Sequence, residues 1–189
     1  MASSVQIIEP RRFGDERGWF SETYKEPDFA ARGIVDRFVQ DNHSLSVPCF
    51  TLRGLHFQTP PHAQAKLVRC IRGHVFDVAV DLRVGSPSYG RWTSAELSAD
   101  NGRQMFIPVG FAHGFLTLEE RCEVTYKCSA LYAPDSDAGL RWDDPDIAVD
   151  WPLPNGTAPE LSDKDRRTPL LRAFVSPFEY DGQPLEPLN

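Results

Sequence analysis

The sequence predicts an all-β protein, a β-sandwich or barrel, on three observations. Short runs of strand-forming residues recur along the chain, turn signals separate them at close intervals, and few stretches favour a helix. The 189 residues suit one domain. A domain of this size buries roughly 70% of the surface of its unfolded chain, enough for a substantial core.

The N-terminal region is expected to form two strands and a short helix. Residues 5–8 read as a first strand, and a turn over 15–18 leads into an aromatic strand over 19–24. A short helix is expected over 27–32, because Gly33 is placed to end it.

The central region holds most of the predicted strands. They cover residues 38–44, 67–71, 75–82, 92–97, 105–108, 110–116 and 122–130. Arg72-Gly73 predicts a hairpin between the second and third of them. Gln40, Asn42 and Ser44 share one face of the first, so this face either lines a polar cavity or faces water at a sheet edge.

The C-terminal region is predicted to be irregular. Prolines punctuate the chain after Tyr132, and Ser162 is placed as the N-cap of a short helix. We therefore expect a single domain over residues 1–189. Its core would span about residues 38–132, with the N-terminal strands at 5–24 and the C-terminal segment 133–189 packed on it.

Composition and charge limit the function. Hydrophobic residues make up 41% of the chain and charged residues 25%, which is typical of a soluble globular protein. The net charge of −7 disfavours nucleic acid and anionic membrane as partners. No apolar run approaches the roughly 20 residues of a membrane span, and we expect no secretory signal. The four cysteines form no C-x-x-C pair and are expected to be reduced thiols of a cytoplasmic protein, although the sequence leaves a disulfide open.

Three basic residues stand close together within strand-like segments. Arg53, His56 and Lys66 together would provide an anion-binding site and a proton-transfer base, whereas any one of them alone is better explained as solvated or structural. In a regular strand Arg53 and His56 would face opposite ways. A bulge at Gly54 would bring both into one cavity, with Lys66 on a neighbouring strand.

Two further residues are candidates for chemistry. Tyr126 lies in the apolar set of its strand, so it is either a core residue or a proton donor. His113 can be a core histidine, a ligand contact or a metal ligand. The chain contains no H-x-H pair, and this spacing argues against a metal site. It also contains neither G-x-S-x-G nor a glycine-rich phosphate loop, so serine-nucleophile and nucleotide-dependent redox chemistry have no support.

Several motifs occur in the order typical of the dTDP-4-dehydrorhamnose 3,5-epimerase family. They lie at residues 40–42, 52–58, 60–66, 73–83, 107–115, 126–127, 132–134, 144–145 and 161–165. The chain resembles this family from about residue 8 to residue 169. The resemblance implies a homodimeric double-stranded β-helix, a jelly roll of the cupin type with a few short helices mainly at the C-terminal end. It also implies no metal, no organic cofactor, and a dTDP-sugar substrate with a ketone at carbon 4.

The resemblance also implies residue roles. His56 would be the base, Asp165 its orienting partner, Tyr126 the acid, and Lys66 the residue facing the enolate oxygen. Tyr132 would stack on the thymine. The other implied substrate-binding residues are Arg17, Glu22, Gln40, Asn42, Arg53, His113 and Lys164, together with Asp137, which stands where the family commonly has glutamate.

Three alternatives remain on the sequence alone. A mono-epimerase acting at carbon 3 or carbon 5 would use the same catalytic residues. A non-catalytic sugar-nucleotide-binding jelly roll is a different class, disfavoured by the joint presence of a base, an acid and an oxyanion-stabilising group. A metal-dependent cupin is the third.

Overall fold

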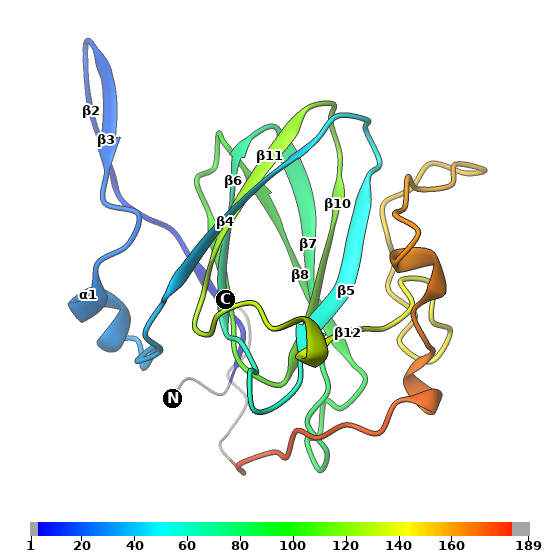
Figure 1. The fold of residues 1–189 in the computed structure, drawn as a ribbon. Helices are drawn as coiled ribbons and strands as arrows, with labels where there is room; N and C mark the ends of the chain where they lie inside the picture. The colour runs from blue at the N-terminus through cyan, green and yellow to red at the C-terminus, as the bar shows by residue number, and fades with distance from the viewer. Residues whose placement is uncertain (1–3, 183–189) are drawn as a thin grey trace.

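A computed structural model describes residues 4–182. It consists of two five-stranded antiparallel sheets packed face to face and a separate two-stranded hairpin (Figure 1). The prediction of an all-β jelly roll with few short helices is confirmed.

Each large sheet draws its strands from distant parts of the chain. The first sheet has the order β1 (Gln6–Ile8), β9 (Gln104–Ile107), β6 (Lys66–Arg72), β11 (Cys122–Cys128) and β4 (Gln40–Ser46). The second has the order β12 (Asp137–Gly139), β5 (Leu52–Gln58), β10 (Phe111–Thr117), β7 (His74–Asp81) and β8 (Trp92–Ser98).

The remaining elements lie outside the two sheets. They are the hairpin strands β2 (Arg12–Asp15) and β3 (Gly18–Ser21), the helix α1 (Glu26–Ala30), and the 3₁₀ turns η1 (Pro134–Ser136), η2 (Asp165–Arg167) and η3 (Leu171–Ala173). The strand expected over 19–24 ends at Ser21, because β2 pairs only with residues up to that point. The hairpin, called the arm below, stands away from both sheets (Figure 1).

Alternation along the strands produces three apolar clusters. Val68, Val75 and Val124 lie between the sheets, where both inner faces meet. The outer face of the second sheet is covered by the C-terminal segment, which contributes a cluster including Leu140, Ile147, Trp151, Leu171 and Phe178. The outer face of the first sheet is partly covered by α1. The N-terminal and C-terminal segments thus pack on the outer faces, while the two inner faces together form the cluster between the sheets.

The predicted hairpin around Arg72-Gly73 is wrong. β6 and β7 belong to different sheets, where β6 pairs with β9 and β11, and β7 pairs with β8 and β10. Gly73 has φ +78°, which lets the chain cross from one sheet to the other in a tight turn. Cys122 packs against this turn, since a Cβ at Gly73 would lie 2.6 Å from its Sγ.

The short helix expected after Ser162 is present as η2, with a different N-terminal residue. Lys164 precedes the first turn of η2, while the Oγ of Ser162 accepts the N–H of Asp165 at 3.1 Å. The last part of the C-terminal segment, residues 183–189, lies outside the described residues.

Candidate active site

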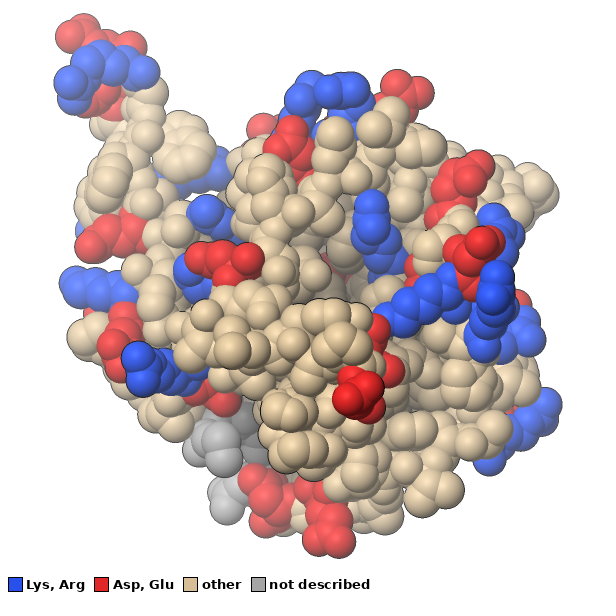
Figure 2. All heavy atoms as spheres, viewed as in Figure 1, with Lys and Arg blue, Asp and Glu red and all other residues tan. Residues whose placement is uncertain are grey.

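A cavity of about 280 Å³ opens between the two sheets. It receives Arg53, His56, His113 and Phe115 from the second sheet, Ser44, Lys66 and Tyr126 from the first, and Ser162, Lys164 and Asp165 from the C-terminal segment. Figure 2 shows a hollow near the middle of this face with basic side chains at its border. The sequence-derived trio of Arg53, His56 and Lys66 therefore meets at one cavity.

A bulge in β5 brings Arg53 and His56 to the same side, as predicted. On β10 their partners Phe115 and His113 are two positions apart, whereas Arg53 and His56 are three apart, so β5 carries one extra residue. Gly54 at φ +139° occupies the bulge. A Cβ there would collide with the Cα of Gly114, so only glycine fits. The expectation of Lys66 on a neighbouring strand is wrong, because β6 lies in the opposite sheet and faces β5 across the cavity.

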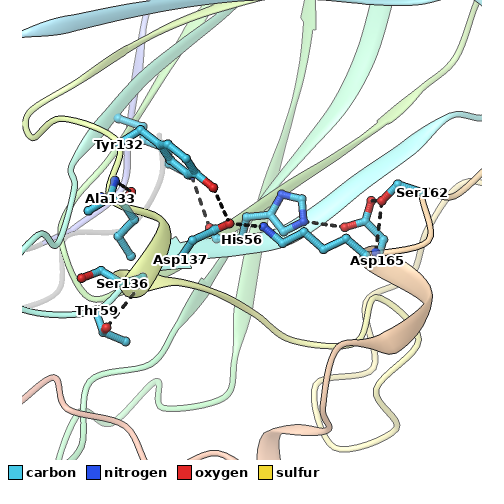
Figure 3. Close-up of polar contacts among 11 residues, drawn as sticks. His56, Thr59, Tyr132, Ala133, Ser136, Asp137, Ser162 and Asp165 are labelled. Atoms are coloured by element: carbon cyan, nitrogen blue, oxygen red, sulfur yellow. Dashed lines mark hydrogen bonds and ion pairs between the residues drawn. The ribbon is translucent and has the colours of Figure 1, made fainter.

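His56 and Asp165 form the central pair. The Nε2 of His56 lies 2.5 Å from Oδ1 of Asp165, and the Ser162 hydroxyl donates to Oδ2 at 2.7 Å (Figure 3). Burial raises the pKa of the Asp165 carboxyl, but the hydrogen bonds from His56 and Ser162 outweigh it, so that pKa lies below its ordinary value. Asp165 is therefore an ionised carboxylate that orients the imidazole.

Lys66 places a buried amino group in the cavity wall. Its residue is 8% exposed, and its Nζ donates to the carbonyl oxygen of His56 at 3.3 Å. Burial lowers the pKa of Lys66, while the negative charges of Asp77 and Asp137 oppose that shift. The ammonium group is thus placed to meet a negatively charged oxygen in the cavity.

Tyr126 faces His56 from the other sheet. Its strand β11 lies beside β6, and the Nζ of Lys66 lies 6.0 Å from the centre of the phenol ring. Burial raises the pKa of the phenol, so Tyr126 keeps its proton at neutral pH. The cavity thus has the His56 imidazole on one wall and a protonated phenol on the other.

His113 carries a second histidine–carboxylate contact, which sequence reasoning did not identify. Its Nε2 lies 2.8 Å from Oδ1 of Asp77, a residue with no exposed surface. Burial lowers the pKa of His113, so the ring is neutral at pH 7. Among the described residues Oδ2 of Asp77 is the buried side-chain oxygen that lacks a partner. The alternation of β7 gave a signal for Asp77, because it placed this carboxyl on the same face as Val75 and Ala79.

Lys164 lines the cavity and is linked to two other predicted substrate-binding residues, Asp137 and Tyr132, at what we call the mouth of the cavity. Tyr132 donates its hydroxyl to Oδ2 of Asp137 at 3.1 Å, and the Nζ of Lys164 contacts the same oxygen at 2.5 Å (Figure 3). Gln40 accepts the backbone N–H of Tyr132 at 2.8 Å, and its amide donates to Asn42 at 3.1 Å. The polar face of β4 thus anchors the mouth.

Within β4 the predicted polar face points into the space between the sheets. Ser44 lines the cavity, and Asn42 on the same face donates to Sγ of Cys128 at 3.4 Å. A second hollow, of about 270 Å³, includes the exposed residues Asp41 and His43, which alternate with them on the outer face.

Arg17 and Glu22 are not brought to the cavity of their own chain. Arg17 lies at the tip of the arm, where its side chain is 85% exposed and pairs with Asp15 at 2.6 Å. Glu22 follows the arm and is also exposed. Figure 2 shows the charged tip of the arm set apart from the main body.

Over residues 4–182 the structure contains no group of three or more histidine, cysteine, aspartate or glutamate side chains placed to hold a metal ion. No helix in this part of the chain is both long and apolar enough to cross a membrane.

Comparison with known proteins identifies the family of the chain. A family model described as dTDP-4-dehydrorhamnose 3,5-epimerase matches residues 2–173. The dTDP-4-dehydrorhamnose 3,5-epimerase of Sinorhizobium fredii is 52% identical over 178 residues, which cover 94% of this chain and 90% of the relative.

The chain is also similar to solved structures of epimerases that act on dTDP-sugars. The dTDP-6-deoxy-D-glucose-3,5-epimerase of Legionella pneumophila, in complex with dTDP-4-keto-L-rhamnose, has a TM-score of 0.84 and 46% identity, covering 89% of this chain and 88% of that one. A 3′-monoepimerase from Streptomyces bikiniensis, in complex with dTDP-quinovose, has a TM-score of 0.82 and 34% identity, covering 89% and 84%. By its family match and its identity to curated relatives, the chain belongs to the dTDP-4-dehydrorhamnose 3,5-epimerase family.

Proposed function

We propose that this protein converts dTDP-4-dehydro-6-deoxy-D-glucose into dTDP-4-dehydro-L-rhamnose by inverting carbons 3 and 5, in dTDP-L-rhamnose biosynthesis. The observation that carries the proposal is a single cavity joining the His56–Asp165 pair, Lys66 and Tyr126. Family membership supports the same activity. Identity is also higher to a 3,5-epimerase, at 52%, than to the 3′-monoepimerase, at 34%.

Proton removal is assigned to His56. The ketone at carbon 4 acidifies the C–H bonds at carbons 3 and 5, so loss of either proton gives an enolate. His56 accepts the proton at Nδ1, because Nε2 already donates to Asp165 at 2.5 Å. Asp165 fixes that tautomer and stabilises the imidazolium that forms. A positioned base of this kind contributes roughly 10²–10⁴-fold to the rate.

Stabilisation of the negatively charged enolate oxygen is assigned to Lys66. Its ammonium is held in the cavity wall before the substrate arrives, so little reorganisation is needed as negative charge develops on the oxygen. One preorganised donor to an oxyanion is typically worth about 2.7–4 kcal/mol of transition-state stabilisation.

Proton return is assigned to Tyr126. Inversion requires that the carbon receive its new proton on the face opposite to the one from which the first was taken. Tyr126 reaches the cavity from the first sheet and His56 from the second. As the enolate returns to the ketone, the phenol oxygen releases its proton to carbon, and exchange with solvent restores both residues.

The nucleotide is assigned to the mouth of the cavity. Arg53 and Lys164 would hold the diphosphate through charge-assisted hydrogen bonds, and Tyr132 would stack on the thymine. Gln40, Asn42, His113 and Asp137 complete the proposed binding set. Asp137 already contacts both Tyr132 and Lys164, which supports its inclusion despite its shorter side chain.

A homodimer would explain the position of Arg17 and Glu22. The arm carries them away from the cavity of their own chain, and it presents Trp19 and Phe20 at 60% and 66% exposure. Exposed aromatic side chains on a projecting element suit contact with another protein surface. In this arrangement the arm of one copy would deliver Arg17 and Glu22 to the cavity of the other.

A cytoplasmic location and cofactor-independent chemistry complete the proposal. The four free cysteine thiols suit a reducing compartment. The proposed proton transfers require only a base, an acid and a cation, which the chain itself supplies.

Incubation with dTDP-4-dehydro-6-deoxy-D-glucose in deuterated water tests the proposal. We expect NMR to show deuterium at both carbon 3 and carbon 5 and formation of the L-rhamno product. Deuterium at one carbon would instead indicate a mono-epimerase, and no exchange would indicate a binding module. Activity lost on dialysis against a chelator and restored by a divalent metal would contradict the cofactor-independent mechanism.

A further inference from the structure

Ser162 contacts the catalytic pair from a position that the proposed mechanism leaves without a role. Its hydroxyl donates to Oδ2 of Asp165 at 2.7 Å and accepts the backbone N–H of the same residue at 3.1 Å. Ser162 also lines the cavity, next to Lys164 and Asp165 (Figure 3).

The two oxygens of Asp165 have separate partners. Oδ1 contacts Nε2 of His56 and Oδ2 accepts from Ser162, so rotation of the carboxylate about its bond to Cβ would break both contacts. Asp165 is 2% exposed, and a buried oxygen left unpaired typically costs about 1–3 kcal/mol. The Ser162 hydroxyl therefore favours the one orientation in which Oδ1 faces the imidazole.

We propose that Ser162 is a positioning residue, whose hydroxyl orients Asp165 so that His56 keeps its proton on Nε2 and its Nδ1 free to act as the base. This inference rests on the proposed function. In this proposal Ser162, Asp165 and His56 form a linear hydrogen-bonded network. Ser162 donates to the carboxylate and forms no bond to the substrate.

A purely structural role for Ser162 is the competing explanation. A serine whose Oγ accepts the N–H three residues on stabilises a turn wherever it occurs. Ser98 makes the same bond to the N–H of Asn101 at 3.0 Å, at the end of β8 and outside the residues that line the cavity. Ser98→Ala is therefore a matched control, because it removes the same kind of turn contact at a place where no carboxylate–histidine pair depends on it.

The variants Ser162→Ala, Ser162→Thr and Ser98→Ala test the inference through kcat, KM and the pH profile of kcat/KM. We expect Ser162→Ala to lower kcat about 10- to 100-fold, the range that a hydrogen bond to a charged group represents, with KM changed less than kcat. The acid limb of the profile should move to higher pH, because the hydroxyl helps to lower the pKa of Asp165. Ser162→Thr should restore most of kcat, and Ser98→Ala should leave it unchanged.

Two results would overturn the inference. One is wild-type kcat in Ser162→Ala. The other is a loss of kcat that follows a lowered melting temperature, with an unmoved pH profile and no rescue by Ser162→Thr. Nitrogen-15 NMR of His56 separates this failure from that of the proposed function. If the wild-type protein fails to exchange substrate protons, but Ser162→Ala alters the Nε2–H tautomer of His56, the activity is wrong and the positioning role stands.

Discussion

Among the side chains that line the cavity, the proposed chemistry distinguishes His56, which removes the proton, from Asp165, which only holds His56 in place. His56→Ala should lower kcat by about 10²–10⁴-fold, while Asp165→Asn should lose less, because Asp165 sets only the tautomer and charge of the ring. Turnover of the dTDP-sugar, followed by NMR, measures both. His74→Ala is the control, since His74 pairs with Glu96 at 3.2 Å and does not line the cavity. Near-wild-type turnover by His56→Ala would contradict the assignment.

The two tyrosines at the site should respond differently to loss of the hydroxyl. Tyr126→Phe should slow epimerisation by about 10²–10⁴-fold, while deuterium exchange survives because the base still acts on its own face. Tyr132→Phe should keep the stacking ring and most of the activity, although it loses the 3.1 Å bond to Asp137. Product NMR in deuterated water measures epimerisation and exchange together. If Tyr126→Phe epimerises normally and Tyr132→Phe does not, the two roles are exchanged.

Residue patterns alone identified only part of the cavity. Basic and aromatic residues in apolar strands singled out His56, Lys66 and Tyr126. Asp165 came from family resemblance, because a lone aspartate 109 positions from its histidine has no local signal. Ser162 was interpreted only as a helix cap, which is half of what its hydroxyl does. Asp77 was visible as a carboxyl on an apolar face, but its partner His113 lies on another strand.

Among the elements, the bulge of β5 matters most for the site, because it brings Arg53 and His56 to the same side of the strand. Gly54→Ala would place a Cβ against the Cα of Gly114 and 3.0 Å from the carbonyl oxygen of His113. Gly18 has a similar φ of +134° with open space around it. We expect Gly18→Ala to cost about 1 kcal/mol of unfolding free energy, and Gly54→Ala about 1–3 kcal/mol more from overpacking. Denaturant unfolding measures both, and equal losses would show that the collision is relieved at no cost.

Strand positions were largely predictable, and strand pairing was not. Most predicted strands lie within a few residues of those observed, because alternation of apolar and polar residues is local. The prediction of a β6–β7 hairpin was wrong, because a tight glycine turn can either reverse the chain within one sheet or carry it from one sheet to the other. Which occurs depends on β11, which pairs with β6 (Glu123 with Arg72), and on β10, which pairs with β7 (Phe111 with Asp81). These partners lie far outside any local pattern.

For the molecule as a whole, the buried ion pair between Asp81 and Arg83 should make the free energy of unfolding depend on pH in acid. Asp81 accepts from the guanidinium of Arg83 at 2.9 and 2.8 Å and from two serine hydroxyls. Burial raises the pKa of Asp81, but these hydrogen bonds outweigh it, so that pKa is below its ordinary value. The pair therefore stabilises the fold above the unfolded-state pKa of about 3.9, and this contribution is lost as pH falls through the folded-state pKa.

Asp81→Asn should remove about 3–5 kcal/mol at pH 7, the usual cost of breaking a buried pair, and should flatten the acid dependence of stability. Asp143→Asn is the matched control, since Arg141 and Asp143 make the same two-bond contact at 2.9 and 2.7 Å on the surface. An exposed pair contributes far less, because water screens the two charges. Urea unfolding at neutral and acid pH measures both variants, and equal losses would contradict the prediction.

The proposed exchange of arms between two copies also belongs at this scale. Arg17→Ala and His56→Ala should each be impaired alone. In a mixed dimer one cavity receives both defects and the other receives none. Unfolding and refolding the two variants together should therefore restore about one quarter of wild-type activity, as expected for random pairing in a two-fold dimer. If the arm serves its own chain, or the protein is monomeric by sedimentation, mixing should restore nothing.

The contact between His56 and Asp165 joins residues that are 109 positions apart in the sequence. The two residues therefore leave the ribosome at different times. During synthesis the N-terminal part emerges first, so the ribosome releases His56 well before it releases Asp165. Until Asp165 has followed, the imidazole lacks the carboxylate that orients it. Under the proposed mechanism, a chain without Asp165 would therefore remove the sugar proton inefficiently.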